Sequence, residues 1–343
     1  MAGPREGARA IGQGGVSEWQ RVEQWRRLGA PRRGRGVVLG IGDDAAVLRL
    51  GHGMDLVASQ DALVEDVHFR RRWTTPADLA HKLLAVSVSD IAAMAAVPRF
   101  ALVALALPAD VDEAWSAAFA RGLRRSARAL GVVLVGGDTV RSPHGILADG
   151  VVLGEVEPDR ARTRAGARPG DVLCLTGRIG GAGVGLRLLE APELAGALSP
   201  AVAASARRSL LRPRPRVAAG EALAPFARAL VDLSDGLAGA VEALTRGRAI
   251  GVEIRARDLP LHPAVRPLAR RLGLDPVDLA LSGGEDYELL AAVPARLAPR
   301  VPRPTCGLRP IGVVTEGPGS VLVGRSGGRR PLPKGYDAFG PGV

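Results

Sequence analysis

Cysteine and histidine are scarce in this 343-residue chain, and their spacing excludes several classes of metal and redox protein. The two cysteines, Cys174 and Cys306, lie far apart, without a CxxC pair or a Cys/His cluster. Cys174 lies within the apolar residues 172–175, where we expect a buried thiol. None of the five histidines belongs to an HExxH motif or to a pair of ligands, so no zinc site is predicted. Two isolated cysteines favour a reducing compartment.

Aromatic residues and lysine are also rare. Aromatic side chains make up 3% of the chain, and Lys82 and Lys334 are the two lysines. Nearly all of the 46 basic residues are therefore arginines, and with 35 acidic residues they give a formal net charge of +11. This balance suggests a polyanionic partner, but few rings are present on which nucleic-acid bases could stack. Because arginine and glycine are abundant over the whole chain, we interpret the charge as a composition bias and expect no nucleic-acid partner.

Long apolar runs are absent. The longest, residues 100–108, is too short to cross a bilayer, and no apolar segment near the amino terminus resembles a signal peptide. We therefore expect a cytoplasmic protein with no membrane partner. With 47% hydrophobic residues the chain can bury a sizeable core, and at about 150 residues per domain its length predicts two domains.

The hydrophobic pattern mixes strands and helices in both halves, which predicts an α+β or α/β fold. Residues 1–16, rich in Gly and Arg, are expected to form a flexible tail. The polar segment 157–170 is the predicted boundary between an N-terminal domain, residues 17–156, and a C-terminal domain, residues 157–343. Helices are expected from Ser17 and over residues 76–97, 111–130, 184–190, from Val217, and over 237–245. Strands are expected at residues 37–39, 55–58, 100–107, 132–135, 146–156, 172–176, 229–233, 251–254 and 287–293, with a hairpin around residues 325–329.

Carboxylates recur where an apolar strand meets Gly, Ser or Thr. The pattern occurs in VVLGIGDD, LVASQD, VLVGGDT and ALVDLSDG, which contain Asp43, Asp44, Asp61, Asp138, Asp232 and Asp235. Such junctions can bring side chains from separate segments together, and crowded carboxylates need protonation, a partner or a cation. Mg²⁺ prefers oxygen ligands of this kind. For any single site, such as Ser234 or Asp235 before Gly236, a helix cap is an equal alternative. The four sites together favour a Mg²⁺ centre.

Four other features leave two interpretations open. Asp90 lies in the mostly apolar stretch LLAVSVSDIAAMAAV, where it is either a buried carboxylate with a partner or part of a solvent-facing stripe. His68 is either a structural or a binding residue. The two acids of the turn at residues 282–287 are either solvated or part of a site. The segment at residues 334–339, with its tyrosine, is either a tail packed on the domain or part of a site.

Nucleotide-binding signatures that rely on lysine are absent. A P-loop is excluded because Lys82 follows His81 and Lys334 follows Pro333 rather than glycine. Residues 40–45 have the spacing of a dinucleotide-binding fingerprint. We reject this interpretation, because two aspartates would face the pyrophosphate without a cation between them. If this chain uses ATP, metal ions must therefore neutralise the phosphate charge.

Nine ordered motifs resemble those of the thiamine-monophosphate kinases, within the superfamily of aminoimidazole ribonucleotide synthetase. They are GIGDDAAVL, D-x-L-V-E-x-V-H-F, K-x-L-A-V-x-x-S-D-I-A-A-M, GGDT-x-R-S, TRAGARPGD, RP-x-PRV, D-L-S-D-G-L, L-S-G-G-E-D-Y-E-L and KGYDAF. The resemblance covers the chain from about Glu18 to Phe339. The resemblance implies direct transfer of the γ-phosphoryl group of ATP to thiamine monophosphate, assisted by several Mg²⁺ ions and often by K⁺. It also implies an N-terminal α+β domain that binds ATP and Mg²⁺, with a sheet that pairs across a homodimer. A C-terminal α/β domain would complete the active site.

The resemblance also implies a role for each matching residue. Those implied in catalysis are Asp44, Asp138 and Asp235. Those implied in ATP binding are Gly137, Asp138, Arg164 and Ser234. Those implied in binding thiamine monophosphate are His68, Glu285 and Tyr336. Those implied in metal binding are Asp44, Ser59, Gln60, Asp61, Asp90, Asp138, Asp232 and Asp235.

Three positions depart from the family pattern. Gln60 stands where Thr is usual, Asp66 replaces a usual Gly near His68, and the N-terminal Glu-Phe pair is Glu18-Trp19. The acceptor phosphate is already anionic near pH 7, because its second pKa is about 6, so a strong general base is not required. Catalysis would consist of in-line positioning and neutralisation by metal.

Two other functions are alternatives. Another ATP-dependent enzyme of the superfamily is the first, although a selenophosphate synthetase should carry a Cys and Lys pair before Cys174 and a hydrogenase-maturation relative should end in Cys. Aminoimidazole ribonucleotide synthetase lacks the DYEL and GYD segments found here. The second alternative is an arginine-rich nucleic-acid-binding protein, whose affinity should fall steeply with salt.

Overall fold

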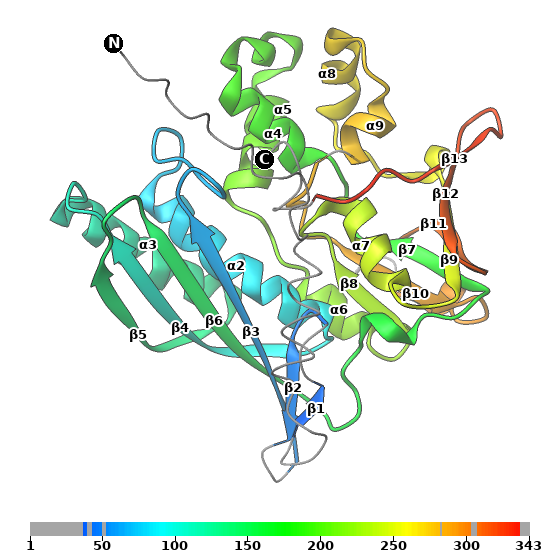
Figure 1. Cartoon of the computed structure of the whole chain (residues 1–343), viewed down its shortest axis with the longest axis horizontal. Helices are drawn as coiled ribbons and strands as arrows, with labels where there is room; N and C mark the ends of the chain where they lie inside the picture. Colours follow the sequence, from blue (N-terminus) through cyan, green and yellow to red (C-terminus); the bar gives the residue numbers. More distant parts are fainter. Residues whose placement is uncertain (1–36, 40–42, 50–52, 282, 303–306, 337–343) are drawn as a thin grey trace, which may run out of the picture.

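The computed structural model describes residues 37–39, 43–49, 53–281, 283–302 and 307–336. Two β-sheets lie on either side of the long helix α2, and the helices α4, α5, α8 and α9 form a separate group beside them (Figure 1). The predicted flexible tail, the predicted helix from Ser17, Cys306 and Phe339 lie outside the described residues. The described chain is a mixed α+β protein, as the sequence predicted.

The first sheet has the strand order β1-β2-β3-β6-β4-β5. All neighbours are antiparallel except β4 and β5, which are parallel and connected by α3, as a parallel pair requires. Its elements are β1 (Val37–Leu39), β2 (Ala46–Arg49), β3 (Asp55–Val64), α2 (Pro76–Ala93), β4 (Val97–Leu107), α3 (Glu113–Leu130), β5 (Val133–Arg141) and β6 (Leu147–Val156).

Local sequence explains where the two helices of this half begin and end. Thr75 caps α2 by accepting the N–H of Asp78, and Pro76 occupies the first turn, where it loses no hydrogen bond. Asp112 caps α3 in the same way, and Gly131 ends it in the left-handed conformation. Alternate residues of β6 are buried against these helices, so the other face of the sheet, which we call the outer face, is left uncovered by them.

Two strands of the first sheet are longer than predicted. β3 continues to Val64 and β5 to Arg141, so Asp61 and Asp138 lie inside strands and not at strand ends. The sequence predicted too short a strand at β5 because the Gly136-Gly137 pair has the composition of a turn. A Cβ on Gly137 would come within 1.9 Å of the carbonyl oxygen of Val103, so glycine here permits close approach of β4.

The second sheet has the order β13-β12-β9-β11-β7-β10-β8. Among the described strands of this sheet, only β9 and β12 are parallel neighbours, so the expectation of a C-terminal α/β domain, which needs a mostly parallel sheet, is wrong. β10 lies between β7 and β8 and is antiparallel to both, so the helices between β7 and β8 do not connect neighbouring strands. The strands are β7 (Asp171–Leu175), β8 (Ala229–Asp232), β9 (Ile250–Arg255), β10 (Leu289–Pro294), β11 (Arg309–Glu316), β12 (Gly319–Val323) and β13 (Arg329–Pro331).

The helices of this half are α4 (Gly181–Glu190), α5 (Pro200–Leu211), α6 (Val217–Leu223), α7 (Gly236–Thr245), α8 (Val265–Leu272) and α9 (Pro276–Leu281). The predicted boundary segment, residues 157–170, connects β6 to β7 and contains the short 3₁₀ helix η1 (Arg164–Gly166). The division into two domains stays a prediction.

A shared core joins the two halves. The end of α2 packs on α6 and on one face of the second sheet, in a cluster that includes Ala93, Leu223 and the buried thiol Cys174, as predicted. A Cβ on Gly220 of α6 would lie 2.2 Å from the carbonyl oxygen of Ala92, so the two helices are in backbone contact. Residues of α2 are therefore held at a fixed place against β8.

Candidate active site

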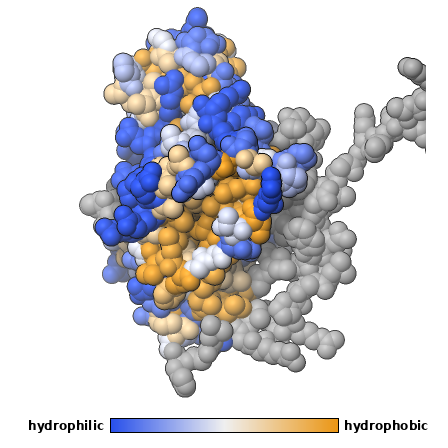
Figure 2. All heavy atoms as spheres, turned by 90° about the vertical axis from the view of Figure 1, so that its left-hand side faces the viewer, coloured by the Kyte–Doolittle hydropathy of each residue, from blue (hydrophilic) through white to orange (hydrophobic). Residues whose placement is uncertain are grey.

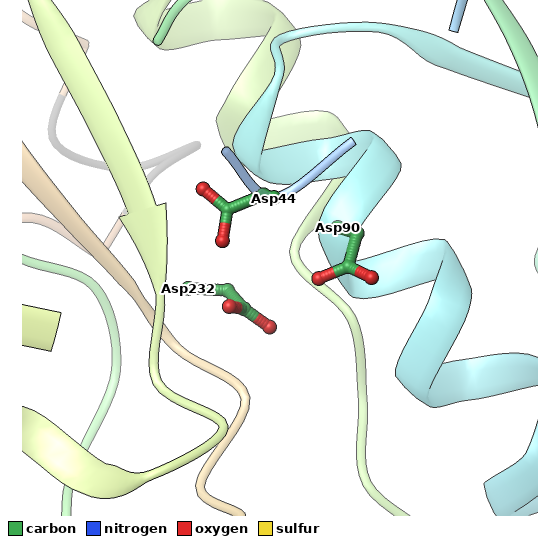
Figure 3. Close-up of side chains that lie close together, drawn as sticks. All are labelled: Asp44, Asp90 and Asp232. Atoms are coloured by element: carbon green, nitrogen blue, oxygen red, sulfur yellow. The ribbon is translucent and has the colours of Figure 1, made fainter. Parts of the chain in front are cut away.

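Three carboxylates from separate segments meet between the two sheets. Asp44 comes just before β2, Asp90 from α2, and Asp232 from the last residue of β8; their oxygen atoms lie within 4.8 Å of one another (Figure 3). Asp44 and Asp232 are buried and Asp90 is partly buried. All three are among the metal ligands that the family resemblance implies, and the structure brings them together.

Hydroxyl groups orient two of these carboxylates. Ser89 of α2 donates to Asp232 over 2.7 Å, and Ser59 of β3 donates to Asp90. The one hydrogen bond joins α2 to β8 and the other joins α2 to β3. The site is therefore built from the contact between the two halves of the chain.

Arg164 closes the cluster from the segment between the sheets. Its guanidinium forms a forked ion pair with Asp44, in which Nε lies 3.0 Å from Oδ2, and its backbone N–H donates to Asp43 over 3.1 Å. Burial, followed by the charge of Asp44, raises the pKa of Asp43 to about 7. Both acids of the GDD motif are thus held by one residue, for which the family resemblance implies ATP binding.

The carboxylates are crowded beyond what Arg164 compensates. Burial is the largest cause that raises the pKa of Asp90 and of Asp232 well above the ordinary value. The next causes are like charges: Asp61 for Asp90, and Asp44 for Asp232. Buried carboxylates this close are stabilised by protonation or by a bound cation.

The surroundings of Asp61 are further evidence that the cluster binds a cation. It lies in β3 beside Ser87 and Asp90 of α2, and burial raises its pKa. Among the described residues, its buried Oδ2 atom has no hydrogen-bond partner. A buried carboxylate oxygen without a donor is costly and is the kind of atom a hard cation would ligate. The donor set of Asp44, Asp61, Asp90 and Asp232, with the hydroxyl of Ser59, fits Mg²⁺.

Gln60 and Asp138 are not brought to this cluster. Successive side chains of β3 alternate between faces, so Gln60 lies on the outer face, where its amide donates to Asp149 over 2.7 Å. Asp138 pairs with Ala104, which pairs with Asp149, so Asp138 lies on the same outer face. It is exposed and accepts the N–H of Thr139 over 2.8 Å. Their metal roles and the ATP role of Gly137 stay predictions.

The structure does bring two predicted substrate residues together. The buried Lys82 of α2 donates to the backbone oxygen of His68 over 3.0 Å and lies 2.6 Å from Oε1 of Glu285. His68 comes from the first half and Glu285 from the second, so this pair also spans the contact between the halves. The sequence alone did not indicate a chemical role for Lys82. The available signal was a lysine retained in a chain that otherwise uses arginine.

The remaining predicted residues of this half lie in the turn before α7 and on the segment after β13. Ser234 accepts the N–H of Glu285 through its backbone oxygen over 2.6 Å. Asp235 occupies the N-cap position of α7, but its side chain makes no capping hydrogen bond, so the alternative of a simple helix cap is not supported. Tyr336 is 52% exposed, and the neighbouring Gly335 approaches Gly239 of α7 closely. Neither Asp235 nor Tyr336 belongs to the three-carboxylate cluster.

Known proteins are similar to this chain in sequence and in fold. Residues 42–156 match the family described as AIR synthase related protein, N-terminal domain. The thiamine-monophosphate kinase of Escherichia coli strain K12 is 41% identical over 75% of this chain and 77% of its own length. That of Bacillus subtilis is 37% identical over 75% and 78%, and that of Mycobacterium tuberculosis H37Rv is 34% identical over 84% and 82%. The chain belongs to the thiamine-monophosphate kinase family. It is therefore an enzyme of the phosphotransferase class.

Solved structures agree with this family assignment. AaThiL complexed with AMPPCP and TMP is 29% identical, with a TM-score of 0.83 over 94% of this chain and 97% of that one. The thiamine-monophosphate kinase of Stenotrophomonas maltophilia K279a is 35% identical, with a TM-score of 0.72 over 88% and 94%. The HypE of a HypE–HypF complex, 18% identical with a TM-score of 0.71, shares the fold alone. No helix in the described ranges is long and apolar enough to span a membrane.

Proposed function

We propose that this enzyme transfers the γ-phosphoryl group of ATP to thiamine monophosphate, giving thiamine diphosphate and ADP. The observation that carries the proposal is the convergence of Asp44, Asp90 and Asp232 between the two halves, in a chain whose relatives are thiamine-monophosphate kinases. The related AaThiL structure holds AMPPCP and TMP.

The carboxylate cluster would hold the metal. Asp44, Asp90 and Asp232, with Asp61 and Ser59 beside them, would bind Mg²⁺, which neutralises phosphate charge during in-line transfer. Arg164, whose guanidinium forks onto Asp44, would bind a phosphate of ATP, since Arg recognises phosphate and carboxylate with the same geometry. The acceptor phosphate is anionic near pH 7 and needs no base to remove a proton.

The second substrate would lie against His68 and Glu285. The Glu285 carboxylate can face the thiazolium cation of thiamine, and Lys82 keeps this acid in place next to the loop of His68. Tyr336, on the exposed segment beside α7, can stack on a ring of the substrate.

A second copy of the chain would cover the outer face of the first sheet. Figure 2 shows an apolar surface on this side of the molecule. Its exposed side chains include Phe100, Val133, Val135, Val140 and Leu147 of β4, β5 and β6. Contiguous exposed apolar surface of this kind marks an interaction site. Gln60 and Asp138 lie on the same face, so the homodimer would place them at or beside the interface.

The test is an assay of the purified chain with ATP, Mg²⁺ and thiamine monophosphate, with and without K⁺. We expect thiamine diphosphate and ADP in equal amounts, and loss of both products with EDTA. Failure to form either product at any Mg²⁺ and K⁺ concentration would overturn the proposal. If ATP is hydrolysed but thiamine monophosphate does not compete with other acceptors, the chain acts on the substrate of another enzyme of the superfamily.

A further inference from the structure

A second, basic cavity lies away from the carboxylate cluster. It has a volume of about 540 Å³ and lies between α5, the connection from α5 to α6, and the segment that follows β7. Asp44, Asp90 and Asp232 do not line it. Five arginines line the cavity: Arg178, Arg208, Arg212, Arg214 and Arg216. The last three belong to the RP-x-PRV motif, for which the proposed reaction gives no role.

Two of these arginines are neutralised by acids of the described residues. Arg216 forms a forked pair with the buried Glu288, with Nε 2.6 Å from Oε2, and Arg212 lies 2.9 Å from Asp78 of α2. Within the described ranges, the guanidinium groups of the other three arginines have no ion pair or hydrogen bond. These three are Arg178, Arg208 and Arg214.

The acids of the cavity are already engaged. Asp286 accepts the N–H groups of Gly180 and Ala182 over 2.7 and 3.2 Å, and burial raises its pKa to about 7. Glu288 also accepts the hydroxyl of Thr176 over 2.7 Å. Neither acid is left to compensate the three unpaired arginines, so the lining carries a net positive charge. A concave wall of one sign concentrates the field and attracts anions.

Neutral hydrogen-bonding groups complete the wall. Nδ1 of His262 accepts the N–H of Ala264 over 3.2 Å, so its hydrogen lies on Nε2 and is donated to Ser205, 3.1 Å away. Burial and then the charge of Arg178 lower the pKa of His262, which keeps the ring neutral. The hydroxyl hydrogen of Ser205 is thus free to be donated elsewhere, and Ser205 lines the cavity.

We propose that this cavity is a binding site for a small phosphorylated molecule, separate from the carboxylate cluster. The planar guanidinium groups match phosphate oxygens in pairs, and a phosphate would relieve the repulsion among Arg178, Arg208 and Arg214. The volume suits a ligand larger than phosphate alone, since small-molecule pockets measure about 300–1,000 Å³. Here the protein's own arginines neutralise the anion, whereas the carboxylate cluster needs metal to hold one.

The test measures binding of inorganic pyrophosphate to the full chain by titration calorimetry in EDTA. Without metal the carboxylate cluster repels the probe, so binding reports on the basic cavity. We expect the double variant Arg208→Ala/Arg214→Ala to bind pyrophosphate at least ten-fold more weakly. The matched control Arg121→Ala/Arg124→Ala removes the same charge from the exposed side of α3 and should bind as the unaltered chain does. Asp232→Asn should also leave binding unchanged.

Two results would overturn the proposal: pyrophosphate fails to bind the unaltered chain in EDTA, or the two double variants bind it equally well. The experiment uses neither thiamine monophosphate nor Mg²⁺. Its outcome is therefore separate from that of the kinase assay, and either proposal can fail while the other stands.

Discussion

At Asp232, the needs of stability and of chemistry oppose each other. Its carboxylate is buried next to Asp44, and both facts raise its pKa, so ionising it without a cation destabilises the folded chain. The same charge is what would hold Mg²⁺ against phosphate. Residues of this kind are retained for function at a cost in stability.

The variant Asp232→Asn separates these two effects. We expect the turnover of thiamine monophosphate to fall by about 100-fold or more, because the site loses a metal charge. In EDTA at pH 8, however, the variant should unfold at a higher urea concentration than the unaltered chain, because a crowded buried charge is gone. Asp258→Asn, which alters a carboxylate paired with Arg255 away from the site, is the control. A variant that is less stable in EDTA would contradict the role of like-charge repulsion.

Lys82 and Glu285 form a pair whose partners come from different halves of the chain. Because Lys82 is buried, Lys82→Met should leave Glu285 without its cation and Glu285→Gln should leave a buried ammonium unpaired; each should cost about 1–3 kcal/mol. The double variant should cost less than the sum of the two. Urea unfolding of all four proteins measures this coupling, and strictly additive losses would show that the pair does not hold the halves together.

At the scale of elements, glycine decides whether β4 and β5 can pair. A Cβ on Gly137 would lie 1.9 Å from the oxygen of Val103, whereas one on Gly136 would lie 3.7 Å from a methyl group of Leu102. Gly137→Ala should therefore destabilise the chain by about 1–3 kcal/mol, and Gly136→Ala by less than about 1 kcal/mol. Thermal unfolding of the two variants checks the difference. Equal effects would mean that β5 shifts to accommodate the side chain.

The same glycines show which parts of the fold could be predicted from the sequence and which could not. Apolar periodicity predicted α2, α3 and most strands, because one face of each is buried. The strand predicted from this periodicity at β5 was too short, because the Gly-Gly pair that permits close strand pairing has the composition of a turn. Helix α8 was missed because Pro267 interrupts its pattern, although a proline in the first turn is tolerated. β11 was missed because it contains Pro310 and Gly312, which lie at an irregularity in its pairing with β7.

The candidate site was predictable for a different reason. Asp44, Asp90 and Asp232 belong to motifs whose order resembles one family, and the structure brings their carboxylates together, whereas their role as metal ligands stays a prediction. Lys82 could not be predicted, because its partners are brought near by the packing of α2 between the halves. The placement of Gln60 and Asp138 on the outer face could not be predicted either, since it depends on strand register and a one-residue shift would reverse it.

At the scale of the whole molecule, the described helices leave the outer face of the first sheet uncovered. Val135 and Val140 of β5 are more than half exposed there, on the edge strand of the sheet. An edge strand with apolar side chains is an aggregation hazard unless another chain covers it. If a second copy packed its outer face against this one about a two-fold axis, it would cover both the exposed apolar side chains and the edge strand β5.

Charge placed on this face should therefore separate the subunits. We expect the unaltered chain to be a dimer by light scattering coupled to size exclusion, and Val135→Glu/Val140→Glu to be a folded monomer, because two carboxylates would be buried without partners at the interface. Leu274→Glu is the control, since Leu274 is 46% exposed on the connection between α8 and α9. If Asp138 acts beside the interface, the monomer should also lose turnover. A double variant that stays dimeric would show that another surface joins the subunits.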